Sequence, residues 1–101
     1  MDFIINNAKW KVRKVTEDEM KVLNEGEVFL GLTDYTKQEI YLLENQANIL
    51  KTLKHELMHV WMYEYGHNQH DRQFTYEDVC EIVSSSIDFI NEKVDMYTIG
   101  D

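Results

Sequence analysis

The sequence predicts a single α+β domain, residues 1–101, in which a small antiparallel sheet of about three strands packs on two long helices, with a short helix near the N-terminus. Three observations predict this class. The chain has 101 residues, 44% of them hydrophobic, which supports one core but not two domains. Short alternating or apolar runs fill its first half, and two long segments with the period of an α-helix fill its second half.

The first predicted elements are a strand and a short helix. Residues 9–15 alternate between apolar and mostly basic side chains, which is typical of a half-buried strand. Thr16 followed by Glu19 forms a capping-box pattern at the start of a helix. This helix is expected to be about two turns long and to stop at Gly26.

Two further strands are predicted from apolar runs at residues 28–32 and 39–43. The polar stretch 33–38 between them is typical of a turn, so we expect the two strands to pair antiparallel.

Two long helices follow. The first spans about residues 46–65 and ends at Gly66. Its apolar side chains fall within one arc of about 120°, and they are Ile49, Leu50, Leu53, Leu57, Val60 and Trp61. The second begins near Thr75, which forms another capping pattern with Asp78. Its predicted core stripe consists of Val79, Ile82, Val83, Ser86, Phe89 and Ile90. The residues after about Val94 carry little structural signal.

Charge and composition exclude several classes of function. Nineteen acidic residues outnumber ten basic ones, giving a net charge of -9, so we expect no nucleic-acid or anionic-membrane partner. The apolar runs are far shorter than the roughly 20 residues that cross a bilayer. The single cysteine cannot close an intrachain disulfide, and the first residues lack the pattern of a secretory signal. We therefore expect a cytoplasmic protein, whose oligomeric state the sequence does not indicate.

The residues that carry chemistry form the run His55-Glu56-Leu57-Met58-His59 inside the first long helix. The i,i+4 spacing places both imidazoles on one helix face, where they can bind one metal ion. Zinc is the expected cofactor because it accepts nitrogen and oxygen ligands and, with three protein ligands, keeps a fourth position for water. Glu56 is the predicted catalytic residue, a general base that takes a proton from that water.

A site of this kind needs a third protein ligand. The candidates downstream are His67, His70, Asp71, Glu77 and Glu81. Glu77 is our choice, because the small residues Cys80 and Ser84 beside it would let this flank approach the first helix closely. Glu81 could then support one imidazole through its free N–H. The group that stabilises an oxyanion stays open, and the candidates are Tyr63, Tyr65, Tyr76, His67 and His70.

The stretches TLKHELMHVWMYEYG and YEDVCEIVSSSI together resemble the short zinc metallopeptidase-like proteins of the ImmA/IrrE type, many of them encoded by phages or prophages. The resemblance covers about half the chain. In that group an HExxH helix precedes a helix whose first Glu completes the zinc site, which implies that role for Glu77 and a supporting role for Glu81. It further implies a minimal zincin-like fold, zinc-dependent hydrolysis of a peptide bond and a protein or peptide substrate, which an exposed edge strand would bind by strand addition.

Two alternatives stay open. In SprT-like metalloproteases a distal histidine is the third ligand, and the segment at His70 weakly resembles theirs. The other alternative is a catalytically silent protein, zinc-binding or metal-free, that keeps the motif and binds a regulatory or host protein through its acidic surface. A chain of this size has few residues with which to enclose a deep substrate cleft, which favours this alternative.

Overall fold

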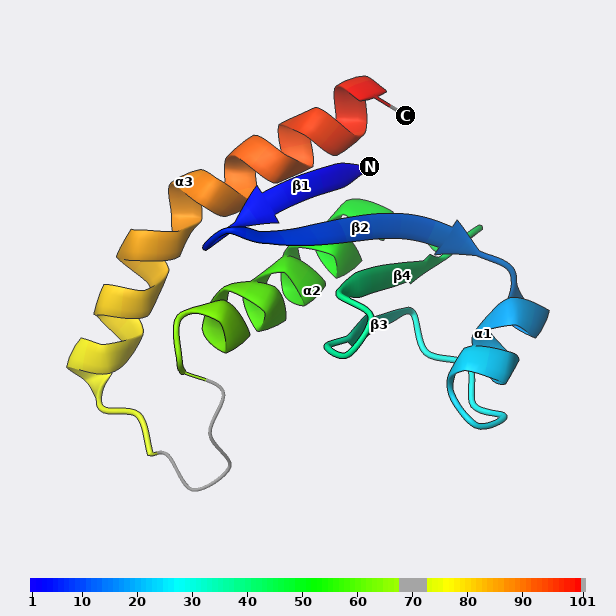
Figure 1. The fold of residues 1–101 in the computed structure, drawn as a ribbon, viewed down its shortest axis with the longest axis horizontal. Helices are drawn as coiled ribbons and strands as arrows, with labels where there is room; N and C mark the ends of the chain where they lie inside the picture. The colour runs from blue at the N-terminus through cyan, green and yellow to red at the C-terminus, as the bar shows by residue number, and fades with distance from the viewer. Residues whose placement is uncertain (68–72, 101) are drawn as a thin grey trace.

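The computed structural model of the chain describes residues 1–67 and 73–100 and has an α+β fold, as predicted (Figure 1). The elements in chain order are β1 (Asp2–Ile5), β2 (Ala8–Val15), α1 (Glu17–Leu23), β3 (Gly31–Asp34), β4 (Glu39–Leu43), α2 (Ile49–Glu64) and α3 (Tyr76–Gly100). None of the helices in these ranges combines the length and apolarity needed to span a bilayer.

The sheet has four strands in the order β1-β2-β4-β3, which corrects the prediction of about three. The sheet is mixed, because β2 and β4 run parallel whereas the two outer pairs are antiparallel. The strand missing from the prediction is β1, which pairs with β2 through a two-residue turn at Asn6 and Asn7. Both residues have positive φ (50° and 64°), the conformation that matches a tight turn to the twist of a hairpin.

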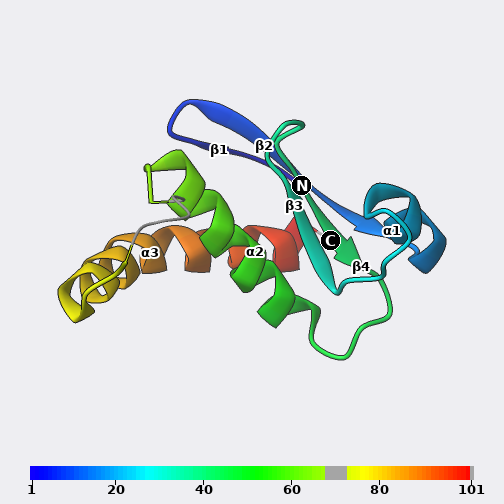
Figure 2. The same cartoon turned by 90° about the horizontal axis from the view of Figure 1, so that it is seen from below.

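Helices α2 and α3 lie side by side on one face of the sheet, and α1 lies at one end of the other face (Figure 2). The main core is formed by apolar side chains of β1, β2, β4, α2 and α3. A smaller cluster beneath α1 contains Val15, Met20 and Tyr41. The capping box predicted for α1 is confirmed by reciprocal hydrogen bonds between Thr16 and Glu19, of 3.0 and 3.1 Å.

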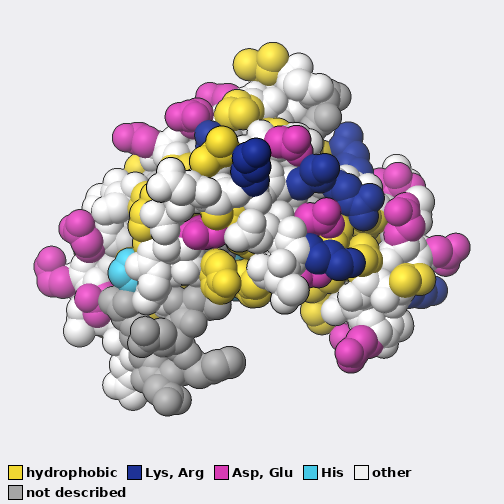
Figure 3. All heavy atoms as spheres, in the orientation of Figure 1, with side chains coloured by type: hydrophobic (Ala, Val, Ile, Leu, Met, Phe, Trp, Pro, Cys, Tyr) yellow, Lys and Arg dark blue, Asp and Glu magenta, His cyan; other side chains and the backbone are white. Residues whose placement is uncertain are grey.

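The part of the sheet that α1 leaves uncovered carries a row of basic side chains. Lys9, Lys11 and Arg13 alternate along β2 and are exposed, and Lys and Arg side chains gather over this region of the surface (Figure 3). Because the inward positions of β2 are apolar and buried, the alternation seen in the sequence separates core from charge, as expected for a strand with one solvated face.

Helix α3 departs from the prediction in two ways. It continues to Gly100, because Val94 and Tyr97 are buried in the main core and so hold its C-terminal half against the sheet. Two residues of the predicted core stripe, Val79 and Val83, are exposed instead. The capping pattern that starts the helix is confirmed by reciprocal hydrogen bonds between Thr75 and Asp78.

Candidate metal centre

Helix α2 positions the two histidines of the motif. Its cap is Asn48, whose side chain accepts a hydrogen bond from the amide of Lys51 at 3.1 Å. Its predicted apolar arc is confirmed, since Leu53, Leu57 and Val60 are fully buried against the sheet. Burial of this arc fixes the rotation of the helix and leaves His55 and His59 exposed beside the core.

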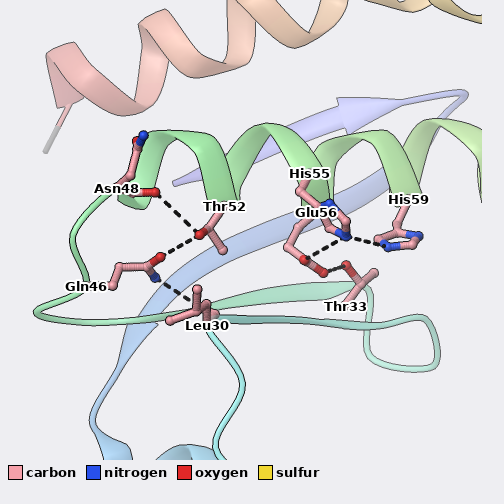
Figure 4. A network of polar contacts seen from close by, with 8 residues as sticks. All are labelled: Leu30, Thr33, Gln46, Asn48, Thr52, His55, Glu56 and His59. Atoms are coloured by element: carbon pink, nitrogen blue, oxygen red, sulfur yellow. Dashed lines mark hydrogen bonds and ion pairs between the residues drawn. The ribbon is translucent and has the colours of Figure 1, made fainter.

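The two imidazoles lie next to each other on one face of α2 (Figure 4). The Nε2 atoms of His55 and His59 are 3.2 Å apart, and their ring centroids are 4.8 Å apart. Two nitrogen ligands at about 2.0–2.1 Å from a tetrahedral zinc ion lie roughly 3.3–3.4 Å apart. The spacing of the two nitrogens therefore fits zinc with little movement of either ring.

Glu56 completes a group of three side chains whose ligand atoms could hold a metal ion. The ligand atoms of His55, Glu56 and His59 all lie within 4.8 Å of one another. Glu56 is only 6% exposed, and within residues 1–67 and 73–100 it is the one charged residue that is buried. A buried carboxylate needs compensating partners because it has left water. Its Oε1 accepts a 2.8 Å hydrogen bond from the Thr33 hydroxyl, and its Oε2 lies 4.0 Å from Nε2 of His55.

Strand β3 lies directly against this part of α2, and alternate residues of the strand and of the turn after it contact one face of the helix. At Gly31 a Cβ atom would lie 2.6 Å from Thr52 Cγ2 and 2.9 Å from Glu56 Cγ, so only glycine allows the strand to come this close. Thr33, two residues on, bonds Glu56. Tyr35 follows the strand and stacks on Tyr63, with 4.7 Å between ring centroids.

The start of α2 is tied to the start of β3 by Gln46. Its Nε2 donates to the carbonyls of Leu30 and Leu43, at 2.9 and 2.7 Å, and its Oε1 accepts a hydrogen bond from Thr52. Figure 4 shows this network at one end of the seam between strand and helix and Glu56 farther along it. The hydrogen bonds of Gln46 thus hold α2 against β3, and they support the position of Glu56 in addition to its own bond to Thr33.

Thr33 and Tyr35 were not predicted as site residues, because the sequence assigns both to a turn. The signal that could have found them is the two-residue alternation Gly31, Thr33, Tyr35, which places all three on one face of a strand. Burial is the main cause that raises the pKa of Tyr35 above its ordinary value, followed by the negative charge of Glu56 and then by Tyr63. The phenol of Tyr35 therefore stays protonated beside the carboxylate.

The described structure does not bring Glu77 into the group of His55, Glu56 and His59. Glu77 is exposed on the first turn of α3, nine residues before Ser86 and thus about 180° around the helix from it. Ser86 contacts α2 through Met58, and Phe89, one turn on, contacts it through Trp61. Cys80 and Ser84 are exposed, so the flank expected to approach α2 is not the one that does.

The other candidates for ligands and oxyanion donors lie in different surroundings. His70 and Asp71 fall outside the described residues. His67 follows α2, half-buried, with its backbone amide bonded to the carbonyl of Met62. Glu81 is exposed and accepts a 3.3 Å hydrogen bond from Ser85. Tyr65 packs on Trp61, Tyr76 is almost fully exposed, and Tyr63 alone of the three packs beside the histidine face.

Comparisons of the chain with protein-family models, with curated proteins and with solved structures find no match. Function is therefore inferred from the geometry of α2 and β3.

The contact between Gly31 and α2 generates a stability prediction. In Gly31→Ala the new methyl group overlaps Thr52 and Glu56, so the strand or both side chains must move. We expect the free energy of unfolding to fall by about 1–3 kcal/mol, the usual effect of overpacking. Urea denaturation followed by circular dichroism measures this change.

Gly100→Ala is the matched control, because a Cβ at Gly100 meets nothing within 4 Å. This variant should be as stable as the wild type. If both variants denature at the wild-type urea concentration, the close approach of β3 to α2 is refuted.

Proposed function

We propose that this chain is a zinc-dependent metallopeptidase with a minimal zincin-like domain, in which His55 and His59 bind the metal and Glu56 is the general base. One observation carries the proposal: two imidazole nitrogens lie 3.2 Å apart, at the spacing of zinc ligands, beside the one buried charged residue within the described ranges. A carboxylate adjacent to a pair of metal-ligating imidazoles is the arrangement that hydrolysis by a metal-activated water requires.

The roles of the residues follow from their positions. Bound zinc supplies a Lewis acid that activates a water molecule for attack on a carbonyl. Glu56 accepts the proton of that water and delivers it to the leaving amine nitrogen, so that the C–N bond breaks as the new C–O bond is kept. Thr33 holds one carboxylate oxygen by its hydrogen bond, which leaves the other oxygen, on the side of His55, for the water. Tyr35, protonated and close to Glu56, is a candidate donor to the oxyanion, together with Tyr63.

The substrate proposed for this site is an extended peptide. Strand β3 is at the edge of the sheet, and within the described residues its outer edge pairs with no other strand. A peptide that adds to this edge would satisfy the free backbone groups of β3. It would also run alongside α2, because β3 itself packs on Thr52 and Glu56. Strand addition would thus bring a scissile bond toward the two histidines.

The third ligand in this proposal is Glu77, as the resemblance to the ImmA/IrrE type implies. Its carboxylate lies on the far side of α3 from the contact with α2, so metal binding would have to rotate or unwind the first turn of that helix. His70, the ligand of the SprT-like alternative, lies outside the described residues. Variants of the two residues separate these arrangements.

The first prediction concerns metal and activity together. Purified protein should contain about one zinc ion per chain by elemental analysis, and it should cleave members of an unstructured peptide library. Glu56→Gln keeps both imidazoles and removes the base, so it should retain zinc and lose at least about 10²-fold in kcat. Chelation should abolish the activity of the wild type, and added zinc should restore it.

Two results of this experiment would contradict the proposal. Peptide cleavage that is unchanged in Glu56→Gln would remove Glu56 from the mechanism. Bound zinc with no cleavage by the wild type would instead favour the catalytically silent interaction protein.

The second prediction concerns the third ligand. His55→Ala should lower zinc affinity strongly, and Glu77→Ala should lower it by more than about 100-fold, beyond the 10–100-fold typical of a residue that only supports a ligand. Competition with a fluorescent chelator measures both affinities. Unchanged affinity in Glu77→Ala with a large loss in His70→Ala would replace our assignment with the SprT-like one.

The third prediction concerns Thr33, as a positioning residue for Glu56. Thr33→Val keeps the shape of the side chain and removes the hydroxyl. A hydrogen bond to a charged group contributes about 1.5–3 kcal/mol, so kcat should fall by about 10–100-fold. KM and zinc affinity should change little.

Thr33→Ser is the matched control, because it retains the hydroxyl and should retain most of the activity. Equal losses in the valine and serine variants would indicate a packing role rather than orientation of Glu56.

A further inference from the structure

A cavity of about 460 Å³ lies where the end of β2, the start of α2 and the C-terminal end of α3 meet. Both helices lie on the same face of the sheet (Figure 2). Sites for small molecules typically have volumes of about 300–1,000 Å³, so the cavity has the size of such a site. Its lining residues include Lys14, Glu44, Ile49, Leu50 and Tyr97.

The hydroxyl of Tyr97 is the feature of this cavity that indicates a ligand. Tyr97 is 5% exposed, and its Oη atom is buried with no hydrogen-bond partner within the described residues. A buried polar group without a partner lowers the stability of the fold, so native structures seldom keep one. The ring of Tyr97 packs in the main core, and a phenylalanine would fill the same space without that cost. The chain thus keeps a hydroxyl that packing does not need.

A lysine adjoins this tyrosine. The Nζ atom of Lys14 lies 5.7 Å from the centroid of the Tyr97 ring, and Lys14 forms no ion pair within residues 1–67 and 73–100. Lys14 is exposed, so its side chain can turn toward a ligand in the cavity. One cation and one hydroxyl donor are therefore available on the same side of the cavity.

The N-terminus of α2 adds to the positive potential. Asn48 accepts hydrogen bonds from the amides of Lys51 and Thr52, whereas the amides of Ile49 and Leu50 have no partner within the described residues. The first turn of the helix contains no acidic side chain to balance the helix dipole. A helix of 16 residues with free amides at its start favours an anion there.

The lining residues also limit the charge and the shape of that anion. Glu44 is the one carboxylate among them and offsets the charge of Lys14. A singly charged group is therefore favoured over a doubly charged phosphate. Ile49 and Leu50 are half-buried and, with the ring of Tyr97, give the cavity an apolar part.

We infer that this cavity binds a small monocarboxylic acid with an apolar body. Its carboxylate accepts hydrogen bonds from the Tyr97 hydroxyl and the Lys14 ammonium beside the start of α2, and its apolar body lies on Ile49 and Leu50. Because Oη is shielded from water, the acid reaches it once the Lys14 side chain, which lies over the ring, turns toward the carboxylate. The cavity contains none of the three motif residues, so this binding needs no metal and does not depend on the proposed activity.

The experiment titrates the full, metal-free chain with hexanoate and follows the backbone amide signals by heteronuclear NMR. The signals of Ile49 and Leu50 should shift saturably, whereas that of His59, farther along α2, should shift much less. Hexanol has the same length but no charge, and it should bind at least about tenfold more weakly. Acetate lacks the apolar body and should also bind at least about tenfold more weakly. Hexylamine should not bind.

Two variants of the cavity separate recognition from packing. Tyr97→Phe keeps the ring and removes the hydroxyl, so the dissociation constant of hexanoate should rise about tenfold or more. The melting temperature of the free variant should equal or exceed that of the wild type, because an unpaired buried hydroxyl is gone. Lys14→Met removes the charge and should likewise raise the dissociation constant about tenfold or more.

Each variant has a matched control. Tyr76→Phe removes a hydroxyl from α3 at a residue that is 93% exposed, and Lys9→Met removes a charge from the outer face of the same strand as Lys14. Both controls should bind hexanoate like the wild type.

Three results would overturn the inference. One is hexanol binding as tightly as hexanoate, which would leave an apolar cavity without an anion site. Another is an unchanged dissociation constant in Tyr97→Phe, which would remove the hydroxyl from recognition. The last is a titration with hexanoate in which the signals of Ile49 and Leu50 do not shift saturably.

Discussion

The seam between β3 and α2 is the constraint on which the candidate site depends. Gly31 lets the edge strand approach the helix so closely that Thr33 reaches the carboxylate of Glu56. That one hydrogen bond, with the neighbouring imidazole, accounts for a charged group in a position that is otherwise closed to solvent. The histidines need no such support, because a regular helix places two residues that are four apart in the sequence next to each other on one face. The helix sets the positions of the imidazoles, and the strand sets the position of the carboxylate beside them.

The sequence predicts the helices of this fold better than its sheet. Both capping boxes are confirmed, since each depends on two residues three apart. The first strand was missed because its four residues are too few for alternation to stand out, although Asn6-Asn7 marks a turn. Parallel pairing of β2 with β4 is a long-range property that no local pattern encodes. Val79 and Val83 have the right spacing for a core stripe, but periodicity alone does not tell which faces of a helix have a neighbour.

The residues of the candidate site were also predictable from the sequence only where they lie on one helix. The motif residues sit on one helix, so their spacing in the chain translates directly into distances in space. Thr33, Tyr35 and Gln46 come from other segments, and only the folded arrangement of strand and helix reveals that they meet α2. For Glu77 the opposite holds. The family resemblance implies that it is the third ligand, but it lies on the side of α3 that faces away from α2. A ligand contributed by a second helix depends on the rotation of that helix, which one sequence does not specify.

Cys80 is suited to site-specific labelling because it is exposed. It is the only cysteine of the chain, it lies in solvent on α3, and it is one residue from Val79. A maleimide dye would therefore attach at a single known point without any substitution. Its emission would respond to whatever molecule settles on that half of the helix, and unlabelled histidines and carboxylates elsewhere would stay chemically intact. The chain thus carries one native attachment point for a spectroscopic label, on the exposed side of α3.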